Sequence, residues 1–189
     1  YMPNAGYPEV REKVAANLNK KYNSSFTKDD IIMTVGAAGG INCVLRSLLE
    51  PEDEVLCFAP FFGEYNSYVM NFGGNLKVVP ADYETFQLNV EEADKYITER
   101  TKAVIINNPN NPSGVVYNKE TLIRYRKCWK RQRNGSDILF TFFLMSHTVN
   151  WYMMAVSFHL RRTILKTALS FIPSVSPCPC LVSVLDIWL

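Results

Sequence analysis

The heptapeptide NPNNPSG, residues 108–114, combines residue types that can hold a ligand group in a fixed position. Asn111 stands before Pro112, and a residue that precedes proline is restricted to extended or turn backbone. An asparagine side chain donates and accepts hydrogen bonds without titrating, which suits a phenolic oxygen on a bound ring. The loop directly follows the apolar run AVIINN, and open α/β sheets bind ligands where their strands end. A plain turn is the alternative interpretation.

The segment VGAAGG, residues 35–40, indicates an anion site. It joins a short apolar run to a helical pattern, so its small residues stand at the amino end of a helix. Free N–H groups and the helix dipole favour a phosphate there, and Ala37 and Ala38 would offer the amides. In the alternative, the three glycines of the segment only permit close packing of the helix on the sheet.

A third loop, APFFGEY, follows the apolar run EVLCF. Phe61 or Phe62 could lie flat on a cofactor ring through aromatic stacking. The alternative is that both phenylalanines belong to the hydrophobic core.

Hydrophobic periodicity predicts the elements that position these loops. Strand patterns cover 31–35, 54–58, 76–80 and 102–107, and helical patterns cover 8–22, 36–49, 60–72 and 89–97. Strands that are separated by helices of this length imply crossover connections and a mainly parallel sheet. The sequence therefore predicts an α/β fold, a mainly parallel sheet flanked by helices.

Composition excludes several classes of function. The chain has 189 residues, 48% hydrophobic residues and a formal net charge of +2, which is too balanced for a nucleic-acid partner. Its five cysteines form no CxxC pair, so neither a metal site nor a secreted disulfide scaffold is predicted, and the reducing cytoplasm is the expected location. The chain opens on Tyr1 without an initiator methionine, which we interpret as truncation.

Together with YMPNAGYPEVR at the start of the chain, the three loops closely resemble class I/II aminotransferases. These are fold type I enzymes that use pyridoxal 5′-phosphate (PLP). The resemblance covers residues 1 to about 125, and NPNNPSG is its most specific part. It implies that residues 1–125 form part of the PLP-binding large domain of an enzyme truncated at both ends.

The resemblance also implies roles for single residues. Tyr1 would reach the cofactor phosphate of the neighbouring subunit in a homodimer, and Ala37 and Ala38 would bind the phosphate of their own subunit. Phe62 would stack on the pyridine ring, and Asn111 would hydrogen-bond its 3′-oxygen. The implied substrates are an amino acid and a 2-oxo acid. A lyase or decarboxylase of the same fold is an open alternative, because the site decides which bond breaks.

The family also needs a lysine that forms a Schiff base with PLP and an aspartate, in an SDE segment, that binds the pyridine nitrogen. Neither segment occurs in frame, so no catalytic residue is assigned and the chain itself is expected to be inactive. When the codons of residues 143–159 are read from the third base of each codon, they can encode SDEPYRELVYDGCELP. In the same frame, the codons of residues 171–188 can encode YSFSKSLSLPGERIGY. The shifted lysine codon spans Val175 and Ser176. We therefore interpret residues 126–189 as an out-of-frame tail without a reliable domain.

The competing hypothesis takes the tail at face value. Residues 138–158 are apolar, His147 is their only side chain that titrates near neutral pH, and Arg161 and Arg162 follow. That pattern is typical of a transmembrane segment, and it would make the chain a non-enzymatic, membrane-anchored α/β module. The frameshift interpretation disfavours a membrane partner.

Overall fold

The structure is a computed structural model. It describes the backbone of residues 1–23, 25–132, 141–145, 152–160, 163–172 and 180–188, and the side chains of residues 1–20, 23 and 25–125. The elements, in chain order, are the helix α1 (Pro8–Tyr22), the short 3-10 helix η1 (Lys28–Asp30), β1 (Ile31–Val35), α2 (Gly36–Leu48), β2 (Glu54–Phe58), α3 (Glu64–Met70), β3 (Asn75–Val79), α4 (Val90–Tyr96), β4 (Thr101–Asn107), α5 (Lys119–Gln132), β5 (Thr141–Met145), β6 (Tyr152–Leu160), β7 (Thr163–Ile172) and β8 (Cys180–Trp188).

The parallel sheet that the sequence predicts is present. Its four strands lie in the order β3-β2-β4-β5, and every neighbouring pair is parallel. After β2 the chain passes to β3 on one side, and it then crosses to β4 on the other side of β2. The strand order therefore reverses between β2 and β4, which is where open α/β sheets form their ligand crevice.

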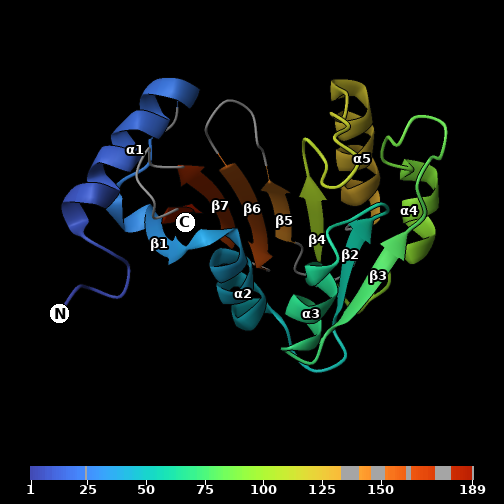
Figure 1. The fold of residues 1–189 in the computed structure, drawn as a ribbon, viewed down its shortest axis with the longest axis horizontal. Coiled ribbons are helices and arrows are strands. Elements are labelled where there is room, and N and C mark those ends of the chain that lie inside the picture. Colours follow the sequence, from blue (N-terminus) through green and yellow to red (C-terminus); the bar gives the residue numbers. More distant parts are fainter. Residues whose placement is uncertain (24, 133–140, 146–151, 161–162, 173–179, 189) are drawn as a thin grey trace.

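Both faces of this sheet are covered because successive side chains of a strand point to opposite faces. Val55 and Cys57 of β2 pack with α2 and α3, whereas Leu56 and Phe58 pack with α4 and α5. The strands read as continuous apolar runs for this reason. Figure 1 shows α2 and α3 on one side of the strands and α4 and α5 on the other. Each fully buried aliphatic side chain contributes about 1.5–3 kcal/mol to this arrangement.

A second sheet was not predicted. Its order is β1-β8-β7-β6, and each neighbouring pair is antiparallel. β1 is a strand, as its apolar pattern predicts, but its hydrogen-bonded neighbour is β8, with Ile31 opposite Val184. The hydrophobic pattern of a strand does not specify its partner, so sequence periodicity could not reveal this pairing.

α1 spans the predicted residues, with Pro8 in the first turn. Val14 and Leu18 are buried against Ile31 of β1 and form a small separate cluster. Val10 stays 39% exposed although it shares the helical stripe with them. The helix therefore buries only the part of its apolar stripe that faces β1.

No helix in the described part of the chain is long and apolar enough to cross a membrane. Within the segment 138–158, residues 141–145 form β5 and residues 152–158 belong to β6. The rest of that segment lies outside the described residues.

Candidate functional site

The predicted site loops leave the sheet at its point of strand-order reversal. β2 and β4 run side by side, with Cys57 opposite Ile105, so their carboxyl ends lie at the same edge. The segment that carries Phe62 follows β2, and the segment that carries Asn111 follows β4. The structure therefore brings two of the predicted site segments to one edge of the sheet, which we call the carboxyl edge.

The loop after β4 is held by its own asparagines. Asn108 accepts a hydrogen bond at Oδ1 from the backbone N–H of Tyr117, at 2.9 Å. Asn110 accepts at Oδ1 from the N–H and the hydroxyl of Ser113, at 3.2 and 2.8 Å, and its Nδ2 donates to the Tyr117 hydroxyl at 3.0 Å. Gly114, at φ +74°, closes the turn in a backbone conformation that favours glycine. These contacts define one rigid loop conformation.

Asn111 differs from the two asparagines before it. Its side chain is exposed, and no hydrogen bond to it occurs within the described residues. Asn108 and Asn110 satisfy the loop, while Asn111 presents a free amide at its tip. An exposed amide that no described residue bonds is open to a ligand, and the role of Asn111 toward a cofactor stays a prediction.

Both phenylalanines after β2 are half-buried, and both contact Tyr65 of α3. The Phe61 ring stacks on Tyr65 with centroids 6.5 Å apart, and the Phe62 ring meets it edge-on at 5.7 Å. Ala37 of α2 packs against the same apolar cluster. Burial raises the pKa of Tyr65, so its hydroxyl stays protonated beneath these rings. The cluster thus gathers two parts of the predicted site, the start of α2 and the aromatic pair, against Ile105 of β4.

The amino end of α2 has no side-chain cap. Val35 occupies the capping position without a side-chain hydrogen bond, and the first turn contains no acidic residue. Gly36 has φ +64°, and a Cβ there would meet no atom within 4 Å, so the backbone conformation, not crowding, favours glycine. Ala37 is half-buried and Ala38 is exposed. The first N–H groups of a helix lack partners inside it, so this end can receive an anion.

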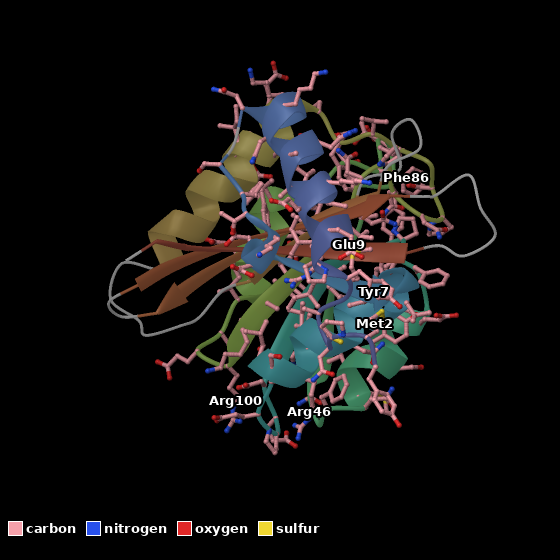
Figure 2. All side chains as sticks on the ribbon, turned by 90° about the vertical axis from the view of Figure 1, so that its left-hand side faces the viewer. Met2, Tyr7, Glu9, Arg46, Phe86 and Arg100 are labelled. Atoms are coloured by element: carbon pink, nitrogen blue, oxygen red, sulfur yellow. The ribbon has the colours of Figure 1, made fainter. Side chains whose placement is uncertain are left out.

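Within its own chain, Tyr1 lies away from the other predicted site residues. It is fully exposed, and Figure 1 shows the amino terminus on the opposite side of the molecule from β2 and β4. The segment behind it is anchored by the N–H of Met33, which donates to the carbonyl of Ala5 at 3.0 Å. Met2 and Tyr7 are also exposed, on the face shown in Figure 2.

A further polar group at the carboxyl edge was not predicted. Asn107, the last residue of β4, is only 4% exposed, and its Oδ1 has no hydrogen-bond partner among the described residues. Burying a carbonyl without a donor costs about 1–3 kcal/mol. The sequence signal was Asn107 itself, an asparagine that directly follows the apolar run AVII, residues 103–106. The edge therefore contains an acceptor that no described residue uses.

Sequence reasoning also missed the loop-holding residues. Asn108, Asn110 and Tyr117 fix the loop, and the sequence interpretation gave a role only to Asn111. A usable signal was the spacing of Asn110 and Ser113, because asparagine often accepts hydrogen bonds from residues two or three positions ahead in a turn.

The two described lysines of the parallel sheet lie beside carboxylates at the edge where β2 begins. The Lys77 Nζ lies 3.3 Å from a carboxylate oxygen of Glu54, and the Lys102 Nζ lies 4.0 Å from one of Asp53. Asp53 and Glu54 stand at the amino end of β2. Neither lysine is therefore placed to hold a cofactor at the carboxyl edge.

Comparison with known proteins extends the likeness beyond the site. The family model for aminotransferase class I and II matches residues 1–134. An aspartate aminotransferase of Pyrococcus abyssi is 42% identical over 124 residues, which cover 65% of this chain and 32% of that protein. An aromatic-amino-acid aminotransferase of Thermococcus litoralis is 42% identical over 125 residues, again 65% of this chain and 32% of the relative.

A solved structure shows the same arrangement. The aminotransferase of Eubacterium rectale matches with a TM-score of 0.74 and 33% identity, over 77% of this chain and 37% of that one. The chain spans about a third of the length of the curated relatives that it matches. Since the family model covers most of the chain, the protein belongs to the class I and II aminotransferase family, whose members depend on PLP.

Proposed function

We propose that this chain is part of a PLP-dependent aminotransferase that transfers an amino group between an amino acid and a 2-oxo acid. The observation that carries the proposal is the loop after β4, whose neighbouring asparagines are bonded within the loop while Asn111 is exposed and free. The relatives are named for aspartate and for aromatic amino acids, so the proposal does not extend to one amino acid.

The residues at the carboxyl edge fit PLP. The uncapped start of α2 offers the amides of Ala37 and Ala38 to the phosphate, and Phe62 offers a ring face or edge to the pyridine. Asn111 offers a donor to the phenolic oxygen, and a hydrogen bond to that oxygen favours its ionised form. Bound PLP would supply an electron sink for charge that develops at the substrate carbon.

Tyr1 fits the proposal only through a second subunit. It is fully exposed and far from β2 and β4 within its own chain. A homodimer would allow it to reach the phosphate held at α2 of the neighbouring subunit, which the exposure of Met2 and Tyr7 beside it supports. We also infer a cytoplasmic location, because Cys43 and Cys57 are free thiols and the cytoplasm keeps thiols reduced.

The aspartate and the lysine of the family are proposed to lie in the shifted reading frame of residues 126–189. β5 supports this inference, because it runs parallel to β4 and ends at Met145, opposite Asn107. The aspartate codon of the shifted frame spans Leu144 and Met145, so the aspartate would stand at the carboxyl edge. The chain in its present frame is then expected to lack turnover.

A ligand without an aldehyde tests the site without labelling surface lysines. Pyridoxine 5′-phosphate, titrated into the isotopically labelled full chain, should shift the NMR signals of the Ala37 and Ala38 amides and the Phe62 ring. Asn111→Ala should weaken binding, whereas Asn71→Ala, a change at another exposed asparagine, should not. PLP itself should bind at the carboxyl edge without forming a link there that borohydride can fix. The proposal fails if the ligand shifts none of these signals, or if its only effects lie elsewhere.

A further inference from the structure

The hydrogen bond between Asn110 and Tyr117 joins two buried polar groups. Asn110 is 6% exposed and Tyr117 is 5% exposed, and the Nδ2 of Asn110 donates to the Tyr117 hydroxyl at 3.0 Å. A buried hydrogen bond in a low-dielectric setting holds its partners strongly, because neither can exchange the other for water. Asn110 therefore has one fixed side-chain orientation.

Tyr117 links this bond to a rigid part of the fold. Its ring belongs to the apolar cluster formed by β2 and β4 with α4 and α5, where Val104 and Ile106 also lie. Its backbone N–H donates to Asn108 Oδ1 at 2.9 Å. Tyr117 thus contacts the loop twice, once at the start of the loop and once at Asn110.

The backbone of Asn110 defines the base of the loop tip. Its N–H donates to the carbonyl of Val115 at 2.8 Å, and its carbonyl accepts from the N–H of Gly114 at 2.7 Å. Asn111 and Pro112 form the exposed tip between these contacts. Because Asn111 makes no side-chain hydrogen bond within the described residues, the backbone that Asn110 holds fixes the direction of its Cα–Cβ bond and so limits the directions that its amide can take.

We propose that Tyr117 and Asn110 are positioning residues that orient the Asn111 amide toward the phenolic oxygen of a pyridoxal-type ligand. The inference rests on the proposed function of this edge. Neither residue touches the ligand; both act by reducing the number of directions in which Asn111 can point. Preorganisation of this kind raises affinity because the ordering entropy is lost on folding instead of on binding. The competing interpretation is that the bond only satisfies two buried polar groups.

Coupling between variants separates the two interpretations. Tyr117→Phe removes one hydroxyl and keeps the ring in its cluster, so the fold is retained. We expect it to weaken the binding of pyridoxine 5′-phosphate to the full chain by about tenfold. When Asn111 is already alanine, the same change should cause no further loss, because the bond acts through Asn111. Independent losses that multiply in the double variant would overturn the proposal.

Two further variants control this result. Tyr96→Phe removes a hydroxyl from another half-buried tyrosine that packs against the same cluster, and it should leave the dissociation constant unchanged. Ser113→Ala removes the 2.8 Å bond from the Ser113 hydroxyl to Asn110 and the 3.4 Å bond that this hydroxyl accepts from the N–H of Val115, and it should weaken binding in the same direction but less. Equal weakening by Tyr96→Phe and Tyr117→Phe would also overturn the proposal.

Hydrogen exchange tests the positioning without any ligand. The N–H groups of Ser113, Gly114 and Tyr117 all donate within the loop, and Tyr117→Phe should speed their exchange by about tenfold while Tyr96→Phe leaves it unchanged. Unchanged exchange in Tyr117→Phe would contradict the inference. If exchange rises as expected but the wild-type chain binds no pyridoxine 5′-phosphate, the proposed function fails and the loop-positioning role stands.

Discussion

The two edges of the parallel sheet differ in whether their polar side chains have partners among the described residues. We call the edge where β2 begins the amino edge. There, Asp53 accepts a hydrogen bond from the N–H of Glu50 at 2.9 Å, and Glu54 accepts one from the Thr98 hydroxyl at 2.6 Å. Lysines of the neighbouring strands lie beside both carboxylates. At the carboxyl edge, the Oδ1 of Asn107 has no partner among the described residues, and the Asn111 amide is free and exposed.

This difference separates stability from function within one sheet. At the amino edge each buried carboxylate has a partly exposed lysine beside it, so removing a lysine would leave a buried charge without its partner. The carboxyl edge carries one buried acceptor, the Oδ1 of Asn107, that costs free energy until a ligand or another residue satisfies it, and one solvated amide, that of Asn111. Changes at the amino edge should therefore alter folding, and changes at the carboxyl edge should alter binding.

The largest expected effect comes from completing the carboxyl edge. Inserting one base near codon 125 should join the shifted frame to residues 1–125 and supply both the aspartate and the lysine segments. If the rest of the reading frame exists downstream, we expect transaminase turnover to rise from none to a measurable rate, and borohydride to fix PLP to the lysine encoded across codons 175 and 176. A stop codon before that lysine, or a repaired protein that binds no PLP, would refute the frameshift interpretation.

At the amino edge, Glu54→Ala should destabilise the chain by about 1–2 kcal/mol, because Lys77 and the Thr98 hydroxyl lose an acceptor that water replaces only in part. Urea unfolding of the full chain measures the change, and Glu99→Ala, at an exposed glutamate, is the control. The affinity for pyridoxine 5′-phosphate of the folded fraction should stay the same. A variant that folds normally but loses binding would show that the two edges are not separate in function.

Asn111→Ala should produce the reverse pattern at the carboxyl edge. Stability should change by less than about 0.5 kcal/mol, because the side chain is exposed and unbonded. Affinity for pyridoxine 5′-phosphate should fall by about tenfold, the equivalent of one hydrogen bond. In the frame-restored protein, this variant should also raise the pKa read from the cofactor absorbance, since the donor favours the ionised oxygen. A loss of stability as large as that of Glu54→Ala would contradict the comparison.

The smallest effect concerns Cys57, which lies in the apolar cluster with Tyr65 and Ile105. Burial raises the pKa of Cys57 to about 12, so this thiol should resist alkylation at pH 8 while the exposed Cys43 reacts. Because the folded pKa is above the unfolded value, this group contributes stability below the ordinary thiol pKa and loses it as pH rises toward 12. Mass spectrometry of alkylated peptides measures the alkylation rates of both thiols. Equal rates would mean that Cys57 is accessible to the reagent and not buried.

Many elements of residues 1–125 could be predicted from the sequence because their signals are local. The pattern of Pro8–Tyr22 gave the helix α1, and the apolar runs gave β2 and β4 with their alternating faces. NPNNPSG pointed to Asn111 because proline restricts the backbone on either side of it. Membership of the aminotransferase family followed from the same loops, and the family model confirms it.

Other features depend on partners that are distant in the chain. The antiparallel pairing of β1 with β8 joins residues about 150 positions apart, and no local pattern specifies such a partner. The assignment of Phe61 and Phe62 also stays a prediction, because both rings pack on Tyr65 in the same cluster.

The sequence by itself determined which residue types follow the strands, and so the kind of chemistry available at the carboxyl edge. Only the tertiary structure decided which of those residues hold the loop and which remain open to a ligand. Of three asparagines in one loop, Asn108 and Asn110 became structural because Tyr117 comes within hydrogen-bond distance of both, and Asn111 was left free. The physical reason is that hydrogen-bond partners are selected by distance and direction in three dimensions, which the chemical identity of a side chain does not contain.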